Sequence, residues 1–276
     1  GIPVHETVLG IRDGRIVCAC RDFTFPDSRL VNFHDLKNSL SDDEPGFTED
    51  ASTGSGVVLA DVRSAIHRIP VLRSIDGVSD RFWDMFVVDA FIRNIDRNNT
   101  NWGVLRNPRG EFSLAPVYDN GNSFNNKRTD SGIERRLANP DLIRQDALDV
   151  RSCYVTDRGK PIAPLKYLAS GQDEECTKAL DRFMERYDPR SFHDLLGSIP
   201  SMSHGLTVVP DGFHEYHRRV CDYRYEHAFM EAWRDLHPTV GVPSSPEASV
   251  PEPLPDPDPS VLPSSSVPTC FDGPGM

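Results

Sequence analysis

The sequence predicts a mixed α+β fold, in which a short β-hairpin is followed by a mainly helical body. Two β-rich runs, 3–10 and 15–23, flank Arg12-Asp13-Gly14, and an Asp-Gly turn between such runs is a strong hairpin signal. Apolar residues then recur at helical spacing over much of the remaining chain (56–69, 79–93, 140–148, 174–187 and 213–236). These observations favour one small β element packed beside many helices.

Composition excludes two classes of protein. Of the 276 residues 38% are hydrophobic, which is enough for a core. No run approaches the roughly 18 consecutive apolar residues of a membrane-spanning helix. The formal charge of −12 argues against binding nucleic acid by neutralising phosphates. We therefore expect neither a membrane nor a nucleic-acid partner, and the absence of a signal-peptide pattern predicts a cytoplasmic location.

The chain changes composition after His237. Eleven of the 23 prolines lie in 238–276, together with serines, five acidic residues and no Lys or Arg. Such a segment cannot bury a core, so we predict a disordered, solubilising tail. Its SSPEASVPEPLPDPDP run could instead dock a proline-recognising module.

The six cysteines do not form a metal-binding pattern. Cys18 and Cys20 stand as C-x-C within an apolar run, a spacing that puts both on one face of a strand. A zinc knuckle requires C-x2-C. We therefore interpret the cysteines as buried thiols in a reducing compartment.

The helix predicted from Ser79 is the most apolar element of the chain. Ser79 is a suitable N-cap, and large apolar residues cover most of the circumference up to Ile92. A helix that is apolar all round is buried in the middle of a domain. Only Asp84 and Asp89 interrupt it, and we expect both to hydrogen-bond neighbouring loops.

A polar loop, NIDRNNTN, follows this helix directly. A strand at 102–105, a turn at 107–110 and a returning strand at 112–118 then lead to Asp119. This hairpin places Asp96 and Asn101 at its entry and Asp119 at its exit, so the three side chains can converge. Oxygen ligands from Asp and Asn suit Mg²⁺. A lone D-x4-N spacing is a weak signal, but here it comes with a hairpin and Asp119-Asn-Gly, as in protein kinases.

The stretches FWDMFVVDAFIRNIDRNNTNWGVL and LAPVYDNG resemble the HipA-like serine/threonine kinases, most closely the CtkA-type branch. GIPVHETVLG and RIVCACRDF resemble the same branch, and the resemblance extends from Gly1 to about Pro238. It implies a protein-kinase-like (HipA-like) α+β fold, with a partial N-lobe hairpin and a mainly helical C-lobe. The domains would be 1–24 (remnant of the N-lobe and hinge), 25–237 (kinase C-lobe) and 238–276 (disordered tail).

The resemblance also implies roles for single residues. Asp96 would be the catalytic base, and Asn101 and Asp119 would bind Mg²⁺. The hinge would run from Cys20 through Arg21 to Phe23 and would meet the adenine of ATP mostly through backbone groups. The expected partners are a protein phosphoacceptor, which could be the chain itself, and an inhibitory protein.

Two departures from the family pattern lead to further expectations. Asn98 stands where the family has His, and it can still donate a hydrogen bond to phosphate. The family's glycine-rich loop, ATP-anchoring Lys and its partner Glu would precede Gly1. We therefore expect that the sequence is a fragment, and that it phosphorylates poorly by itself.

Other functions remain open from the sequence. The same loop could serve a small-molecule or lipid kinase, or a pseudokinase that binds partners without transfer. A Mg²⁺-dependent phosphodiesterase lacks an additional cluster of acids or histidines near Asp96. The loop 122–132 offers hydroxyls at Ser123, Thr129 and Ser131 for phosphorylation, although a plain solvated loop is the simpler interpretation.

Overall fold

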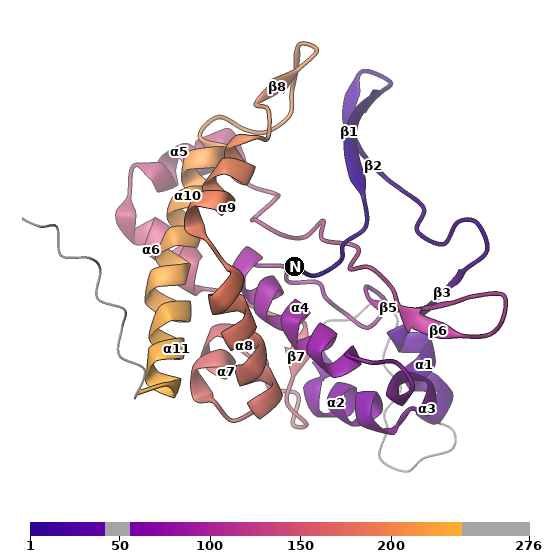
Figure 1. Cartoon of the computed structure of the whole chain (residues 1–276). Coiled ribbons are helices and arrows are strands. Elements are labelled where there is room, and N and C mark those ends of the chain that lie inside the picture. The colour runs from indigo at the N-terminus through magenta and orange to yellow at the C-terminus, as the bar shows by residue number, and fades with distance from the viewer. Residues whose placement is uncertain (42–55, 239–276) are drawn as a thin grey trace, which may run out of the picture. The chain divides into compact units, whose positions relative to one another are not determined.

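Residues 1–41 and 56–238 are described by a computed structural model, and they belong to one unit, Gly1–Thr239 (Figure 1). The surface loop predicted at 41–46 and the predicted proline-rich tail lie outside the described residues, apart from their boundary positions. None of the helices in the described part of the chain combines the length and apolar character needed to cross a membrane.

Helix α4 (Val78–Ile92) lies in the middle of this unit, as its apolar circumference predicts (Figure 1). Phe82, Trp83 and Phe86 are at most 2% exposed. Helices α2 (Leu59–Arg68), α7 (Pro164–Ser170), α8 (Glu174–Arg186) and α10 (Phe213–Arg224) contact α4. The N-cap is Gly77, with a positive φ of 76°, two residues before the predicted N-cap Ser79.

A three-stranded antiparallel sheet follows α4 in the chain. Its order is β3 (Arg29–Asn32), β5 (Gly103–Arg106) and β6 (Phe112–Leu114). Strands β5 and β6 form the predicted hairpin, although β6 ends at Leu114 rather than at residue 118. Gly103 is required where it pairs with Asn32, because a Cβ there would lie 2.2 Å from the Val31 carbonyl oxygen.

The predicted N-terminal hairpin forms from β1 (Thr7–Arg12) and β2 (Arg15–Cys20). Asp13 and Gly14 both have positive φ, as a tight hairpin turn requires. The segment before β1 runs beside the strand that leads to Asp119: the Val117 amide donates to the Pro3 carbonyl at 2.8 Å, and the Val117 carbonyl accepts from His5 at 3.0 Å. The hairpin base therefore adjoins the predicted metal-binding segment.

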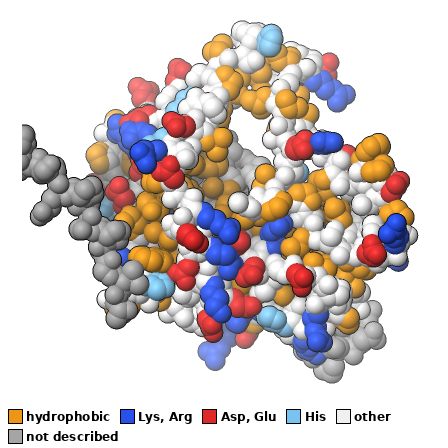
Figure 2. Space-filling model, viewed as in Figure 1, with side chains coloured by type: hydrophobic (Ala, Val, Ile, Leu, Met, Phe, Trp, Pro, Cys, Tyr) orange, Lys and Arg blue, Asp and Glu red, His pale blue; other side chains and the backbone are white. Residues whose placement is uncertain are grey.

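The expectation that all cysteines are buried is wrong for the first pair. Cys18 and Cys20 are exposed, whereas Cys153, Cys176 and Cys221 are buried, and all five are free thiols. The physical reason is that β1 and β2 form an isolated two-stranded sheet. Val8 is 66% exposed on it, and Figure 2 shows hydrophobic side chains at the surface there.

The rest of the described chain is mostly helical, as predicted. Helix α6 matches the predicted range 140–148, and α8 ends one residue before the predicted Tyr187. The long helix predicted at 213–236 is continuous, but a π-helical turn interrupts its regular α-geometry. The remaining elements are short (α1 Phe33–Ser41, β4 Val57–Val58, α3 Pro70–Arg73, α5 Asp130–Leu137, α6 Pro140–Leu148, β7 Tyr154–Val155, α9 Pro189–Gly197, β8 Met202–Ser203, β9 Leu206–Thr207, η1 Tyr225–Phe229 and α11 Met230–Leu236).

Candidate active site

The loop that carries Asp96 begins where α4 ends in a left-handed cap. Arg93 has φ 58° and its amide donates to the Asp89 carbonyl. Asn94 continues the turn, because its side-chain amide donates to Asp89 Oδ1 at 3.0 Å and its Oδ1 accepts from the Asp96 amide at 3.2 Å. Short polar side chains that bond to nearby backbone groups favour such turns over further helix.

The Asp96 carboxylate is held by two asparagine amides. Asn98 Nδ2 donates to Oδ1 at 3.0 Å, and Asn122 Nδ2 donates to Oδ2 at 2.9 Å. Asn101 Nδ2 donates to the Asp96 carbonyl at 2.7 Å. The side chain is half-buried, and a carboxylate has about four lone-pair positions, so it retains acceptor capacity for a substrate hydroxyl.

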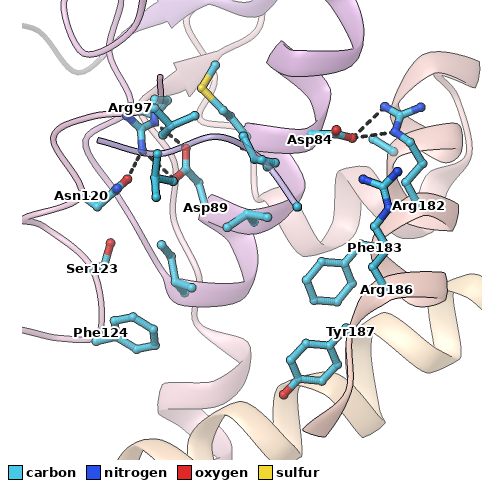
Figure 3. A pocket seen from close by; sticks show the side chains of 18 residues that line it. Asp84, Asp89, Arg97, Asn120, Ser123, Phe124, Arg182, Phe183, Arg186 and Tyr187 are labelled. Carbon is cyan, nitrogen blue, oxygen red and sulfur yellow. Dashed lines mark hydrogen bonds and ion pairs between the residues drawn. The ribbon is translucent and has the colours of Figure 1, made fainter. Parts of the chain in front are cut away.

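One buried arginine connects this loop to the segment around Asp119. Arg97 Nη1 donates to the carbonyl of Asn101 at 2.8 Å and to that of Tyr118 at 2.5 Å. Nη2 donates to Asn120 Oδ1, and Nε donates to Asp89 Oδ2 at 2.8 Å (Figure 3). We call this group, Arg97 with Asp89 and its three other acceptors, the Arg97 clamp.

The ion pair of the clamp is almost completely removed from water. Arg97 is 2% exposed and Asp89 is 7% exposed. Burial raises the pKa of Asp89, and the charge of Arg97 together with hydrogen bonds from Arg97 and Asn94 opposes that shift. A buried carboxylate paired with a guanidinium in a fixed geometry gives the loop one defined position.

Asp119 and Asn101 have the free oxygens that a metal site needs. Asp119 is exposed, and within the described residues its carboxylate makes no hydrogen bond or ion pair. Asn101 Oδ1 accepts only a long contact of 3.3 Å from the Thr100 hydroxyl. No group of three or more His, Cys, Asp or Glu residues forms a metal site in the described ranges, so phosphate oxygens or water would have to complete the coordination.

The predicted hinge residues differ in what their side chains contact. The Phe23 ring packs against Tyr118, the neighbour of Asp119, with centroids 5.6 Å apart. The Arg21 guanidinium instead bonds both Glu6 oxygens, at 2.9 and 3.1 Å, and its amide donates to the Glu6 carbonyl. Cys20 is the exposed last residue of β2. The structure therefore brings Phe23 next to the candidate site, while the Arg21 side chain points to Glu6.

The segment after Asp119 is fixed by a second ionic group. Arg128 Nη2 and Arg136 Nε both donate to the Asp146 carboxylate, which is 9% exposed. Tyr216 Oη donates to Asp146 Oδ2 at 2.7 Å. Of the three predicted hydroxyls in this segment, Ser123 is buried at 6% exposure, whereas Thr129 is exposed and caps helix α5.

Sequence reasoning missed the Arg97 clamp, Asn122 and Asn94. The signal for the clamp was present, because an aspartate within a fully buried helix requires a cationic or hydrogen-bonding partner. Asp89 is such an aspartate, and Arg97 follows it by eight residues. Nothing in the local pattern indicated that Asn122 bonds to Asp96.

Comparisons with known proteins agree on one relative. The chain is 33% identical over 205 residues to the serine/threonine-protein kinase CtkA of Helicobacter pylori strain J99. The matched segment covers 74% of this chain and 61% of that relative. The crystal structure described as a Helicobacter pylori proinflammatory kinase CtkA superposes with a TM-score of 0.75 at 28% identity, covering 87% of this chain and 82% of that one. No protein-family model matches the sequence.

Proposed function

Because the chain is a homologue of CtkA and shares the fold of that kinase, we propose that it carries out ATP- and Mg²⁺-dependent phosphoryl transfer to Ser or Thr of a protein. The observation that supports this most directly is the Arg97 clamp. A single guanidinium bonds the carbonyls of Asn101 and Tyr118, so the predicted base loop and metal-binding segment are held side by side. Preorganised positioning is the main contribution of a protein to phosphoryl transfer.

Each predicted residue has a distinct task in the proposed reaction. Asp96 accepts the proton of the attacking hydroxyl, and the amides of Asn98 and Asn122 orient its carboxylate. Asn101 and Asp119 would hold Mg²⁺, which neutralises charge on the nucleotide phosphates when bound. Phe23 offers an apolar ring beside Tyr118 against which the nucleotide could pack.

Among the described residues, the loop that carries Asp96 offers no uncommitted cation for the phosphates. Arg97 is the basic residue of the loop, and its guanidinium already bonds four acceptors. Asn98, at the position of the family His, donates to Asp96 and carries no charge. We therefore propose that full activity needs a phosphate-binding cation from outside the described residues. CtkA is longer than the matched segment, since the chain spans only 61% of it.

Radiolabelled transfer from [γ-³²P]ATP to a protein phosphoacceptor, the chain itself included, tests the proposal. Asp96→Asn should lower transfer by a factor of about 10² to 10⁴, the usual contribution of a general base. Asp157→Asn, in an exposed turn, is the matched control and should leave transfer unchanged. Equal transfer by the Asp96→Asn and unchanged proteins would exclude the assigned base.

A nucleotide thermal-shift measurement distinguishes the kinase from a pseudokinase. A kinase site should give a stabilising shift with ATP that requires Mg²⁺ and disappears in Asp119→Asn. A shift without any transfer would support a binding module, and transfer to a lipid or small molecule but to no protein would support the other kinase class.

A further inference from the structure

A second feature of the unit is a cavity of about 520 Å³ between helices α4 and α8. Met85, Val88 and Ile92 of α4 line it. Phe183 of α8, labelled in Figure 3, lines it as well. Gly1, Ile2, Val4 and Phe124 also line it. This volume is within the range of pockets that bind small organic molecules, and its walls are mainly apolar.

The charged residues of this cavity leave one cation without a partner. Arg97 is paired with Asp89, and Arg182 Nη2 lies 2.7 Å from an Asp84 oxygen. Arg186, one turn further along α8, is exposed and has no carboxylate within 4.0 Å among the described side chains. Arg182 also pairs with Asp80, which does not line the cavity, so Arg186 is the lining side chain in the described structure whose positive charge has no carboxylate partner.

Two hydroxyls of the lining residues also lack partners. Ser123 Oγ and Tyr187 Oη are buried, and neither is hydrogen-bonded within the described structure. Ser123 is 6% exposed, and it lies across the cavity from Tyr187 (Figure 3). A buried polar group without a partner costs about 1–3 kcal/mol, which a polar group of an occupant could recover after a change of side-chain rotamer.

We propose that this cavity binds a small amphiphilic anion, with an apolar body against the α4 and α8 walls and one acidic head group near Arg186. The apolar walls exclude a sugar or a nucleotide as the body of the ligand, because the polar groups of a sugar or nucleotide would lose their hydrogen bonds to water without gaining partners in the cavity. The unpaired guanidinium selects an anion over a neutral amphiphile. Asp96, Asn101 and Asp119 do not line this cavity, but Asp89, Arg97 and Asn120 of the Arg97 clamp do, so it adjoins the candidate active site from the other side of the clamp.

The test uses the full 276-residue chain and 1-anilinonaphthalene-8-sulfonate, an aromatic anion whose fluorescence rises in apolar surroundings. We expect saturable binding with one site per chain. Val88→Trp fills the cavity and should abolish that binding, whereas Val71→Trp, on the separate helix α3, is the matched control and should preserve it. Unchanged binding by Val88→Trp would overturn the proposal, since the probe would then lie elsewhere, for example on the exposed hairpin.

The acidic head group is tested by competition. Decanoate should displace the probe at a concentration at least fivefold lower than 1-decanol does, and Arg186→Gln should raise the dissociation constant for decanoate roughly threefold to fivefold. Arg190→Gln, on the neighbouring helix α9, is the control and should have no effect. Equal displacement by decanoate and decanol would overturn the assignment of an anion. Because Arg186 is exposed, this arm is informative even if Val88→Trp does not fold.

The partnerless hydroxyls give an independent readout. The double variant Ser123→Ala/Tyr187→Phe removes two unsatisfied polar atoms, so the unliganded protein should melt no lower than the unchanged one. The increase in melting temperature caused by decanoate should be smaller in the double variant. An unchanged increase would show that the hydroxyls do not contact the occupant. None of these measurements requires ATP, so their failure is distinguishable from failure of the proposed kinase function.

Discussion

Replacing Arg97 by Met should be one of the most destabilising single changes in the chain. It leaves the Asp89 carboxylate, 7% exposed, without its cation and removes the donor to the Asn101 and Tyr118 carbonyls. Breaking a buried ion pair by removing one partner costs about 3–5 kcal/mol. We therefore expect the free energy of unfolding in urea to fall by about 4 kcal/mol, with an unchanged m-value.

Two variants and the pH dependence show whether the lost pair is the cause. Arg109→Met, in an exposed turn, should change stability by less than about 0.5 kcal/mol. The double variant Asp89→Leu/Arg97→Met should be more stable than Arg97→Met alone, since no buried charge is left unpaired. Without Arg97, burial raises the pKa of Asp89 against only the hydrogen bond from Asn94, so its protonated form should favour the folded state at low pH.

The destabilisation by Arg97→Met should therefore be smaller at pH 5 than at pH 8. A loss below about 1 kcal/mol that does not change between these pH values would refute the assignment of the Arg97 clamp as a buried, charge-paired link. The loss of unfolding free energy in Asp89→Leu/Arg97→Met should differ from the sum of the losses in the two single variants, because the effects of changes at paired residues are not additive. A loss equal to that sum would refute the assignment as well.

Three further changes test other parts of the structure. Gly103→Ala should destabilise the chain by more than about 2 kcal/mol in urea, because its Cβ would lie 2.2 Å from the Val31 carbonyl oxygen. Burial lowers the pKa of His217 to about 3, so below about pH 6.5 the unfolded chain binds a proton that the folded chain does not bind. The free energy of unfolding should therefore fall by about 2 kcal/mol between pH 8 and pH 5. This fall should be absent in His217→Phe. Asp146→Asn should speed hydrogen exchange in 122–132, and unchanged exchange there would mean that its two arginine contacts do not fix this segment.

The sequence was sufficient for features that depend on neighbouring residues. The Asp13-Gly14 turn fixed the first hairpin, and the apolar circumference of α4 located the centre of the unit. Asp96, Asn101 and Asp119 were proposed as site residues because each stands at the end of a recognisable element, and their roles stay predictions. Boundaries were less accurate, as at β6 and at the Gly77 cap, because hydrogen bonding to distant residues decides where an element ends.

Exposure of the first two cysteines could not be predicted from their own strand. An apolar run has the same pattern whether or not another layer covers it, and β1 and β2 form a sheet with no third strand. The predicted division of the chain at residue 24 stays a prediction, and so do the tail and the roles of single residues.

By itself, the sequence determined the type and order of the elements and supplied the residues that we propose for phosphoryl transfer. Tertiary structure alone decided that Arg97 joins Asp89, Asn101 and Tyr118, and that α4 and α8 enclose a cavity with an unpaired Arg186 beside it. The physical reason is that periodicity and turn chemistry act over a few residues. Which buried charge meets which partner, and which apolar faces leave a space between them, depends on packing between segments far apart in the chain.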